Sequence, residues 1–133
     1  MKIYYPILVS SLLFLLFSCG NDDEGILIDE REKFLGTYAG MEVCGQLSDN
    51  GNIIIITSVE GSNDQLSIQH LYNFGTTIIA TVSGDNLTIE SQTVGLVRFS
   101  GSGSIIGDAL TIDYTVSDPF GFSGDCTASL TKI

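Results

Sequence analysis

What is scarce in this chain already excludes several classes of protein. Its 133 residues include no tryptophan, two prolines, one histidine and only five basic side chains. The basic side chains are scattered, at Lys2, Arg31, Lys33, Arg98 and Lys132. A nucleic-acid-binding surface needs a clustered positive stripe that neutralises phosphates, so we exclude nucleic acid as a partner.

Acidic residues dominate the charged positions. Sixteen aspartates and glutamates against five basic residues give a formal net charge of −11. Such a charge keeps a domain soluble and repels it from anionic lipid, so any membrane attachment must be covalent or hydrophobic. Hydrophobic residues make up 44% of the chain, which is too many for a disordered protein, and the length suits one domain.

The N-terminal residues have the pattern of an export signal. A short positive start, Met1–Lys2, precedes an uncharged run from Pro6 to Ser18. This run is shorter than the roughly 20 residues that span a bilayer, but it suits a secretory signal peptide. Its end at Cys19 resembles the lipobox of bacterial lipoproteins. The resemblance implies that residues 1–18 are removed and that Cys19 is lipidated; an ordinary signal peptide is the alternative.

Residues 19–28 form the predicted acidic linker after the lipidated cysteine. The stretch from Cys19 to Glu24 (CGNDDE) resembles the acidic export signal of Bacteroidetes surface lipoproteins. That resemblance implies a lipid-anchored domain in the cell envelope, at the outer membrane and exposed on its outer face. A solvated spacer on a periplasm-facing anchor is the alternative.

Residues 29–133 predict one all-β domain preceded by a short helix over Ile28–Leu35. The remaining segments are rich in β-branched residues and bounded by Gly, Asn, Asp and Ser clusters, at the spacing typical of an antiparallel barrel or sandwich. The predicted strands are Thr37–Cys44, Asn52–Val59, Gln65–Leu71, Thr76–Ser83, Asn86–Thr93, Leu96–Ile106, Ala109–Ser117 and Asp125–Lys132.

An internal repeat indicates how these strands are connected. Three segments share the form Asp-x-Leu-(Ser/Thr)-Ile-(Gln/Glu/Asp), and they begin at Asp64, Asp85 and Asp108. Each copy starts at a turn and then alternates, so that Leu and Ile lie on one face of a strand. The pattern predicts an eight-stranded up-and-down meander of hairpins rather than a solenoid.

The cysteines bear on whether the sheet closes. With Cys19 lipidated, Cys44 and Cys126 remain, on the first and last predicted strands. In an exported protein this pair favours a disulfide, which needs α-carbons within about 7 Å and therefore neighbouring strands. The meander would then form a closed or flattened barrel. Two free thiols or a zinc site are the alternatives, but His70 is the only other nitrogen or sulfur ligand of the kind that zinc prefers.

A family resemblance extends over the predicted domain. Phe34 to Tyr38 (FLGTY), the short helix and the eight strands resemble the small lipocalin-like lipoproteins of Bacteroidetes. The segment Gly36-Thr37-Tyr38 is similar to the Gly-x-Trp of lipocalin first strands, with Tyr38 where Trp is usual. The resemblance implies a lipocalin-like barrel, although short strands enclose less volume for a ligand.

Four aromatic residues in loops are the candidate ligand-binding residues: Tyr72, Phe74, Phe120 and Phe122. Loop aromatics can flank a binding mouth and contact an apolar ligand or a sugar face. Folding inward to close the core is the alternative. No catalytic residues are predicted, because His70 lacks a recognisable nucleophile or carboxylate partner.

Other motifs have simpler structural explanations. Asp49–Asn52 and Asp118 with Asp125 provide too few oxygen ligands, at the wrong spacing, for a calcium loop, and turn chemistry explains them equally well. We therefore predict no metal site and no cofactor. The glycine–serine stretch Ser100–Ser104 lacks the following helix and lysine of a phosphate loop, and it suits a bend in a curved strand.

These observations predict a non-enzymatic, lipid-anchored envelope protein that binds a small apolar ligand or a protein partner at the loop end of the barrel. A glycan- or calcium-assisted adhesion module and a structural surface protein without a pocket are the alternatives.

Protease treatment of intact cells tests the outward placement. If the domain lies on the cell surface, external protease digests it in intact cells, and a periplasmic marker protein remains whole as the control. Survival of the domain in intact cells, followed by digestion after lysis, would place it on the periplasmic side.

Overall fold

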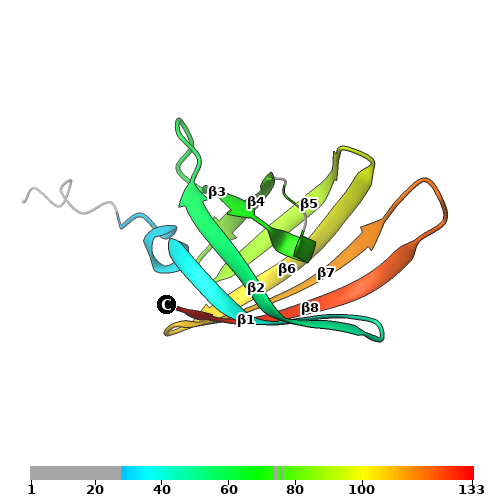
Figure 1. The fold of residues 1–133 in the computed structure, drawn as a ribbon. Coiled ribbons are helices and arrows are strands. Elements are labelled where there is room, and N and C mark those ends of the chain that lie inside the picture. Colours follow the sequence, from blue (N-terminus) through cyan, green and yellow to red (C-terminus); the bar gives the residue numbers. More distant parts are fainter. Residues whose placement is uncertain (1–27, 74, 76) are drawn as a thin grey trace, which may run out of the picture.

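Eight antiparallel strands form a closed barrel in the computed structural model, which describes residues 28–73, 75 and 77–133 (Figure 1). Each strand pairs with the next along the chain, and β1 pairs back with β8. The predicted all-β, up-and-down closed barrel is therefore confirmed. The signal peptide, Cys19, the linker up to residue 27, and Phe74 lie outside the described residues. The strands are β1 (Gly36–Cys44), β2 (Leu47–Ser58), β3 (Gln65–Gln69), β4 (Thr77–Ser83), β5 (Asn86–Val94), β6 (Val97–Ile106), β7 (Ala109–Ser117) and β8 (Ser123–Lys132).

The start of β2 differs most from the prediction. The cluster Ser48–Gly51, expected as a turn, belongs to β2 and pairs with the end of β1. The actual turn is Gly45–Gln46, because Cys44 and Leu47 are paired and Gly45 takes a φ of 61°. Glycine accepts this left-handed conformation without a steric penalty, so the hairpin closes earlier than the polar cluster suggests.

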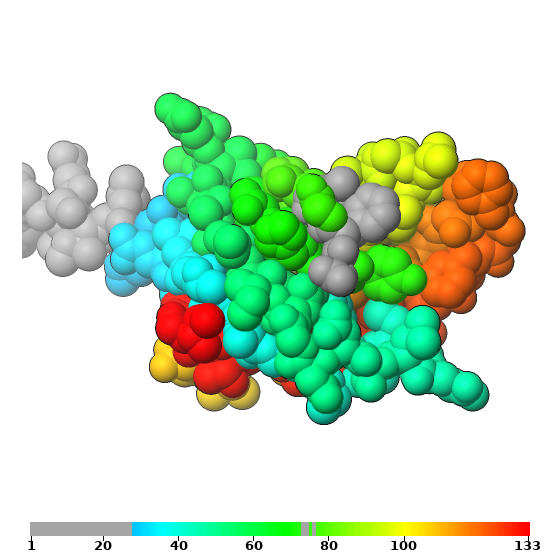
Figure 2. All heavy atoms as spheres, in the orientation of Figure 1, coloured from blue at the N-terminus to red at the C-terminus, as the bar shows by residue number. Residues whose placement is uncertain are grey.

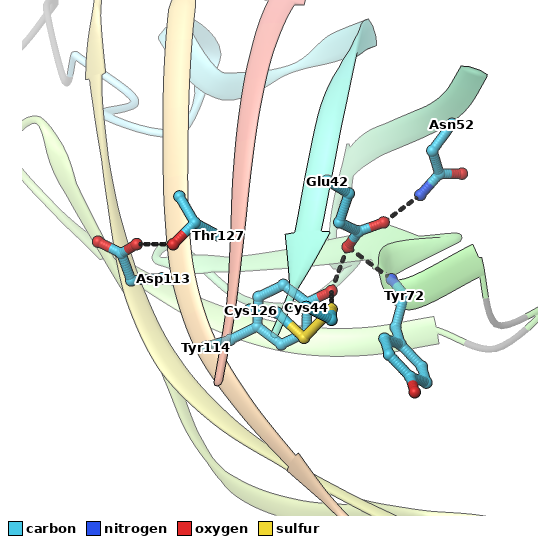
Figure 3. The surroundings of a disulfide bond; sticks show 8 residues. All are labelled: Glu42, Cys44, Asn52, Tyr72, Asp113, Tyr114, Cys126 and Thr127. Atoms are coloured by element: carbon cyan, nitrogen blue, oxygen red, sulfur yellow. Dashed lines mark hydrogen bonds between the residues drawn. A yellow bond between two sulfur atoms is a disulfide. The ribbon is translucent and has the colours of Figure 1, made fainter. Parts of the chain in front are cut away.

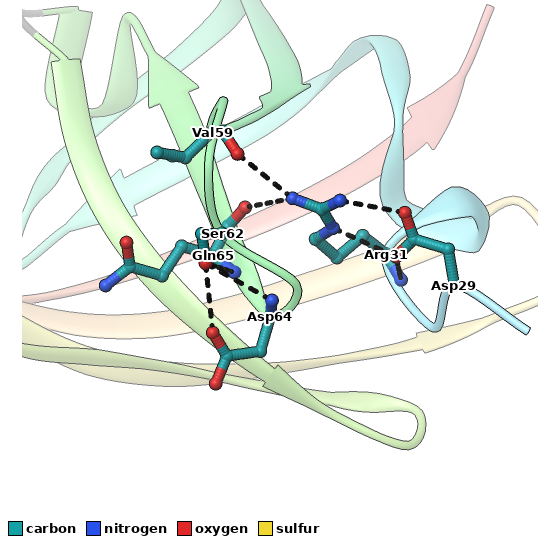
Figure 4. Close-up of polar contacts among 6 residues, drawn as sticks. All are labelled: Asp29, Arg31, Val59, Ser62, Asp64 and Gln65. Atoms are coloured by element: carbon teal, nitrogen blue, oxygen red, sulfur yellow. Dashed lines mark hydrogen bonds and ion pairs between the residues drawn. The ribbon is translucent and has the colours of Figure 1, made fainter. Parts of the chain in front are cut away.

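The predicted helix over Ile28–Leu35 is also wrong. Only one 3-10 turn, η2 (Glu32–Phe34), forms there. Eight residues are too few for a stable α-helix without tertiary support, and here tertiary contacts favour another conformation. The Arg31 guanidinium bonds Asp29 and also donates to the carbonyls of Val59 and Gln65 at 3.2 and 3.3 Å (Figure 4).

The η2 turn covers one end of the barrel. Phe34 is fully buried, and its carbonyl accepts a hydrogen bond of 2.9 Å from the Tyr38 hydroxyl. The three repeats also begin at this end. Each repeat begins a strand, and the backbone carbonyl of its aspartate accepts a hydrogen bond from a backbone N–H near the end of the next strand. The pairs are Val82 N–H to Asp64, Ile105 N–H to Asp85 and Lys132 N–H to Asp108. We call this end of the molecule the closed end.

Side chains from all eight strands fill the barrel. The alternation of each strand directs every second residue inward, and these core residues are at most 5% exposed. The largest fully buried side chains are Tyr38, Phe34 and Phe99. The core therefore occupies the region where a larger barrel would hold a ligand.

The seam between β1 and β8 is closed by the predicted disulfide. Cys44 and Cys126 are direct register partners, with α-carbons 4.1 Å apart and an S–S bond of 2.01 Å. Gly40 lies in the same seam, where a Cβ atom would come within 2.0 Å of the Ser129 carbonyl oxygen. The two strands approach this closely because position 40 has no side chain.

Reduction of this disulfide should lower the free energy of unfolding. The bond links residues 82 positions apart, and a loop of this length implies a loss of about 4.5 kcal/mol on the chain-entropy model. Urea unfolding with and without reductant measures the change. The Cys44→Ala/Cys126→Ala variant serves as the control and should not respond to reductant. Equal stability of oxidised and reduced protein would contradict the assignment.

Candidate functional site

The end of the barrel opposite η2 carries the candidate site, and we call it the mouth. It consists of the connections β1–β2, β3–β4, β5–β6 and β7–β8, at residues 45–46, 70–76, 95–96 and 118–122. Figure 1 shows these connections on the side away from the N-terminal segment. The β3–β4 connection contains a second 3-10 turn, η3 (Leu71–Asn73).

Four exposed apolar side chains lie on the connections of the mouth. Leu47, Leu96, Phe120 and Phe122 are 69%, 63%, 82% and 44% exposed. The loop with the two phenylalanines forms the orange projection at the right of Figure 2. Such residues on neighbouring loops are typical of a binding surface.

The structure brings together two of the four predicted site residues. The rings of Tyr72 and Phe122 lie with centroids 6.4 Å apart. Phe120 is at the tip of the same loop, and Phe74 lies outside the described residues. The other interpretation of these aromatics, that they fold inward to close the core, is wrong for Phe120 and Phe122, which are exposed, but Tyr72 is partly buried and packs against the core.

Aspartates considered as calcium ligands accept hydrogen bonds from backbone N–H groups close to them in the sequence, Asp118 in a turn and Asp49 within β2. Asp118 Oδ1 accepts the backbone N–H groups of Phe120 and Phe122 at 2.9 and 3.0 Å, and Asp49 Oδ1 accepts that of Gly51 at 3.0 Å. These are the local bonds that aspartate favours in turns. In the described part of the chain, no group of three or more His, Cys, Asp or Glu side chains is placed to hold a metal ion.

A buried carboxylate, Glu42, lies beneath the mouth and was not identified from the sequence. Its side chain points inward from β1 and is 4% exposed. Oε2 accepts a bond of 2.6 Å from Asn52 Nδ2, and Oε1 accepts one of 2.8 Å from the Tyr72 backbone N–H and another from the Tyr114 hydroxyl (Figure 3). These donors come from β2, η3 and β7, so one carboxylate joins four elements.

Strand alternation could have identified Glu42. Counting by twos from the buried Tyr38 places Gly40, Glu42 and Cys44 on the inner face of β1. The apolar neighbours Met41 and Val43 point outward and are 47% and 36% exposed. With apolar residues on both sides of it, Glu42 is the polar member of the alternation, and a simple polar-outward pattern would place it on the surface.

The Glu42 cluster also fixes the β3–β4 connection. Asn52 Nδ2 donates a second bond, of 2.9 Å, to the carbonyl of His70. His70 and Tyr72 both have left-handed backbones, with φ of 71° and 61°. This conformation is unfavourable for side chains of this size, so the bonds to Asn52 and Glu42 hold the segment in place. The His70 side chain itself is exposed.

Burial dominates the electrostatics of the two tyrosines inside the barrel. Burial, and then the hydrogen bond to Glu42, raises the pKa of Tyr114 far above its ordinary value of 10.0. Burial likewise raises the pKa of Tyr38 to about 12. The Tyr114 hydroxyl, which also lies 3.9 Å from Cys44 Sγ, therefore remains a proton donor to Glu42.

A hollow of about 160 Å³ opens at the mouth beside this cluster. It is lined by Glu42, Cys44, Leu47, Ser48, Asp49 and Tyr72. One predicted ligand-binding residue, Tyr72, and one disulfide cysteine, Cys44, line the hollow. The sequence did not predict Glu42, Leu47 or Ser48 as site residues. The hollow lies on the β1–β2 hairpin, where Ser48 and Asp49 are strand residues that pair with β1. The sequence predicts a turn at Ser48–Gly51, so it does not place these side chains beside Glu42.

Comparison of the chain with protein-family models, curated proteins and solved structures finds no match. Within residues 28–73, 75 and 77–133, no helix has the length and apolar content required to cross a membrane.

High pH should destabilise the domain through the buried tyrosines. Tyr38 and Tyr114 hold their protons more tightly in the folded chain than in the unfolded chain, where the pKa is about 10. The stabilisation is complete below about pH 10 and is lost as pH rises toward the folded values. Urea midpoints across this range measure the loss, and the Tyr38→Phe/Tyr114→Phe variant should show a flatter profile. An equal slope in the variant would contradict the assignment.

Proposed function

We propose that this chain is a lipid-anchored, non-enzymatic binding protein of the cell envelope, exposed at the outer membrane. Its ligand, a small apolar molecule or a protein partner, binds at the mouth of the barrel. The observation that carries the proposal is the set of exposed apolar side chains on the connections of the mouth, of which Leu47 lines the hollow. Leu47 and Phe122 lie within this set, and Tyr72 joins them through its contact with Phe122.

Packing of the interior favours the mouth as the binding site. The core side chains occupy the barrel, and Phe34 and Leu71 are both fully buried. A ligand inside the barrel would have to displace several of these side chains, at a cost of several kcal/mol. A ligand at the mouth contacts apolar surface that is already exposed.

The path of the chain supports an accessible mouth. The described residues begin at Ile28, next to η2 at the closed end (Figure 1). Residues 20–28 then connect the predicted lipid on Cys19 to this end, and they extend to roughly 30 Å at most. The closed end would therefore lie toward the membrane and the mouth away from it.

The hydrogen bonds of Glu42 support a binding role for the mouth rather than catalysis. A general base needs a carboxylate positioned to accept a proton from a substrate. Both oxygens of Glu42 already accept hydrogen bonds from the protein itself. The group is thus a support for the mouth, joining β1 to Asn52, Tyr72 and Tyr114.

A glycan ligand is the second candidate. It is favoured by the ring of Phe120, which is 82% exposed at the tip of its loop. An exposed aromatic ring can stack on the apolar face of a sugar. Loss of glycan binding in a Phe120→Ala variant, with apolar ligand binding retained, would favour this alternative.

Titration with an apolar fluorescent probe tests the main proposal. Leu47→Ser and Phe122→Ser should each weaken probe binding about fivefold or more, because each removes apolar contact area at the mouth. Ile106→Ser is the matched control, since Ile106 is 83% exposed at the closed end. Equal weakening by the control, or none by the mouth variants, would contradict the proposal. Native mass spectrometry of the protein from its own cells would then identify the ligand.

A further inference from the structure

Glu42 is a buried carboxylate beneath the mouth, and no basic side chain of the described residues forms an ion pair with it. It is 4% exposed, and its three hydrogen-bond donors, an amide, a backbone N–H and a phenol, are all neutral. Buried charges in proteins are usually paired, because hydrogen bonds alone recover only part of the lost hydration. The site therefore favours the approach of a cation.

The basic side chains of the described residues do not provide that cation. Arg31 pairs with Asp29 and Lys33 with Asp85, both at the closed end. Lys132 lies over the ring of Tyr38 and bonds the Lys33 carbonyl, also at that end. Arg98 donates to Ser91. None of these contacts of the four Arg and Lys side chains includes Glu42.

The hollow beside Glu42 has the composition that suits an organic cation. Asp49 adds a second carboxylate, Tyr72 adds an aromatic residue, and Leu47 with the Cys44 sulfur adds apolar surface. Carboxylate, aromatic and apolar groups together recognise alkylated ammonium ions, which combine positive charge with an apolar surface. The hollow, of about 160 Å³, has room for a small organic ion.

We infer that the hollow lined by Glu42, Asp49, Tyr72 and Leu47 binds a small alkylammonium ion. The inference rests on the proposed function and names the ligand class of the same site. A bare metal ion fits less well, because it needs several converging oxygen ligands, whereas Glu42 and Asp49 already accept hydrogen bonds from the chain. An organic cation needs nearby carboxylates and a surface for van der Waals contact, and it does not need several oxygen atoms that converge on one point.

A pair of isosteric probes separates charge from shape. Choline and its neutral isostere 3,3-dimethylbutan-1-ol are titrated into the mature chain, with amide NMR shifts at Leu47, Asp49 and Tyr72 as the readout. We expect saturable choline binding at least about tenfold tighter than binding of the isostere, since the cation gains both the carboxylates and the ring.

Matched variants locate the site. Tyr72→Asn removes the ring while suiting the φ of 61°, and should weaken choline binding about tenfold; Tyr72→Phe keeps the ring and should retain binding. Asp49→Asn should weaken binding, whereas Asp108→Asn, with the same change in net charge at the closed end, should not. Glu42→Gln should also weaken binding, and if it does not fold, the Asp49 and Tyr72 variants decide.

The outcomes separate this inference from the proposed function. Equal affinity for choline and the neutral isostere would overturn the cation inference and leave the mouth as an apolar site. Absence of choline binding, or binding unchanged in Tyr72→Asn and Asp49→Asn, would also overturn it. The proposed function is decided separately by the apolar probe and its Ile106 control.

Discussion

The pairing of β1 with β8 is the constraint on which the rest of the structure depends. Seven residue pairs join these strands, from Tyr38 with Lys132 to Cys44 with Cys126. The pairing satisfies the backbone groups that a sheet edge would leave open, and the disulfide secures it at the mouth. It also creates the site, because Glu42 on β1 meets Tyr114 on β7 across β8, where the facing residue is the small Ala128.

The two ends of the barrel differ in chemistry. Ion pairs of Arg31 and Lys33, together with buried Phe34, close the end at which the chain enters. The other end has apolar loop tips and a buried carboxylate without a basic partner. Natural domains depart from the usual rules of burial mainly at functional sites, and the buried carboxylate lies at the mouth. Exposed apolar side chains occur at both ends, with Ile106 at the closed end. The buried Glu42 carboxylate and the hollow beside it distinguish the mouth from the closed end.

The support of the mouth is itself costly in free energy. Burying Glu42 requires neutral donors from three elements, and the segment around Tyr72 adopts an unfavourable left-handed backbone. A purely apolar plug would be simpler and as stable. The arrangement gives the β3–β4 connection one fixed position beside the hollow, which is the property that a binding site requires.

The sequence by itself predicted most of the strands and their antiparallel order, and it favoured a disulfide between Cys44 and Cys126. Alternation and turn residues are local signals, as in Ala109–Ser117, whereas the pairing of Cys44 with Cys126 was predicted on the premise that Cys19 is lipidated. Only the tertiary structure decided that Ile28–Leu35 forms a single 3-10 turn, that β2 begins at Leu47, and that Phe120 and Phe122 stay exposed. It alone revealed the contact between Glu42 and Tyr114, because these residues lie 72 positions apart and no local pattern relates them.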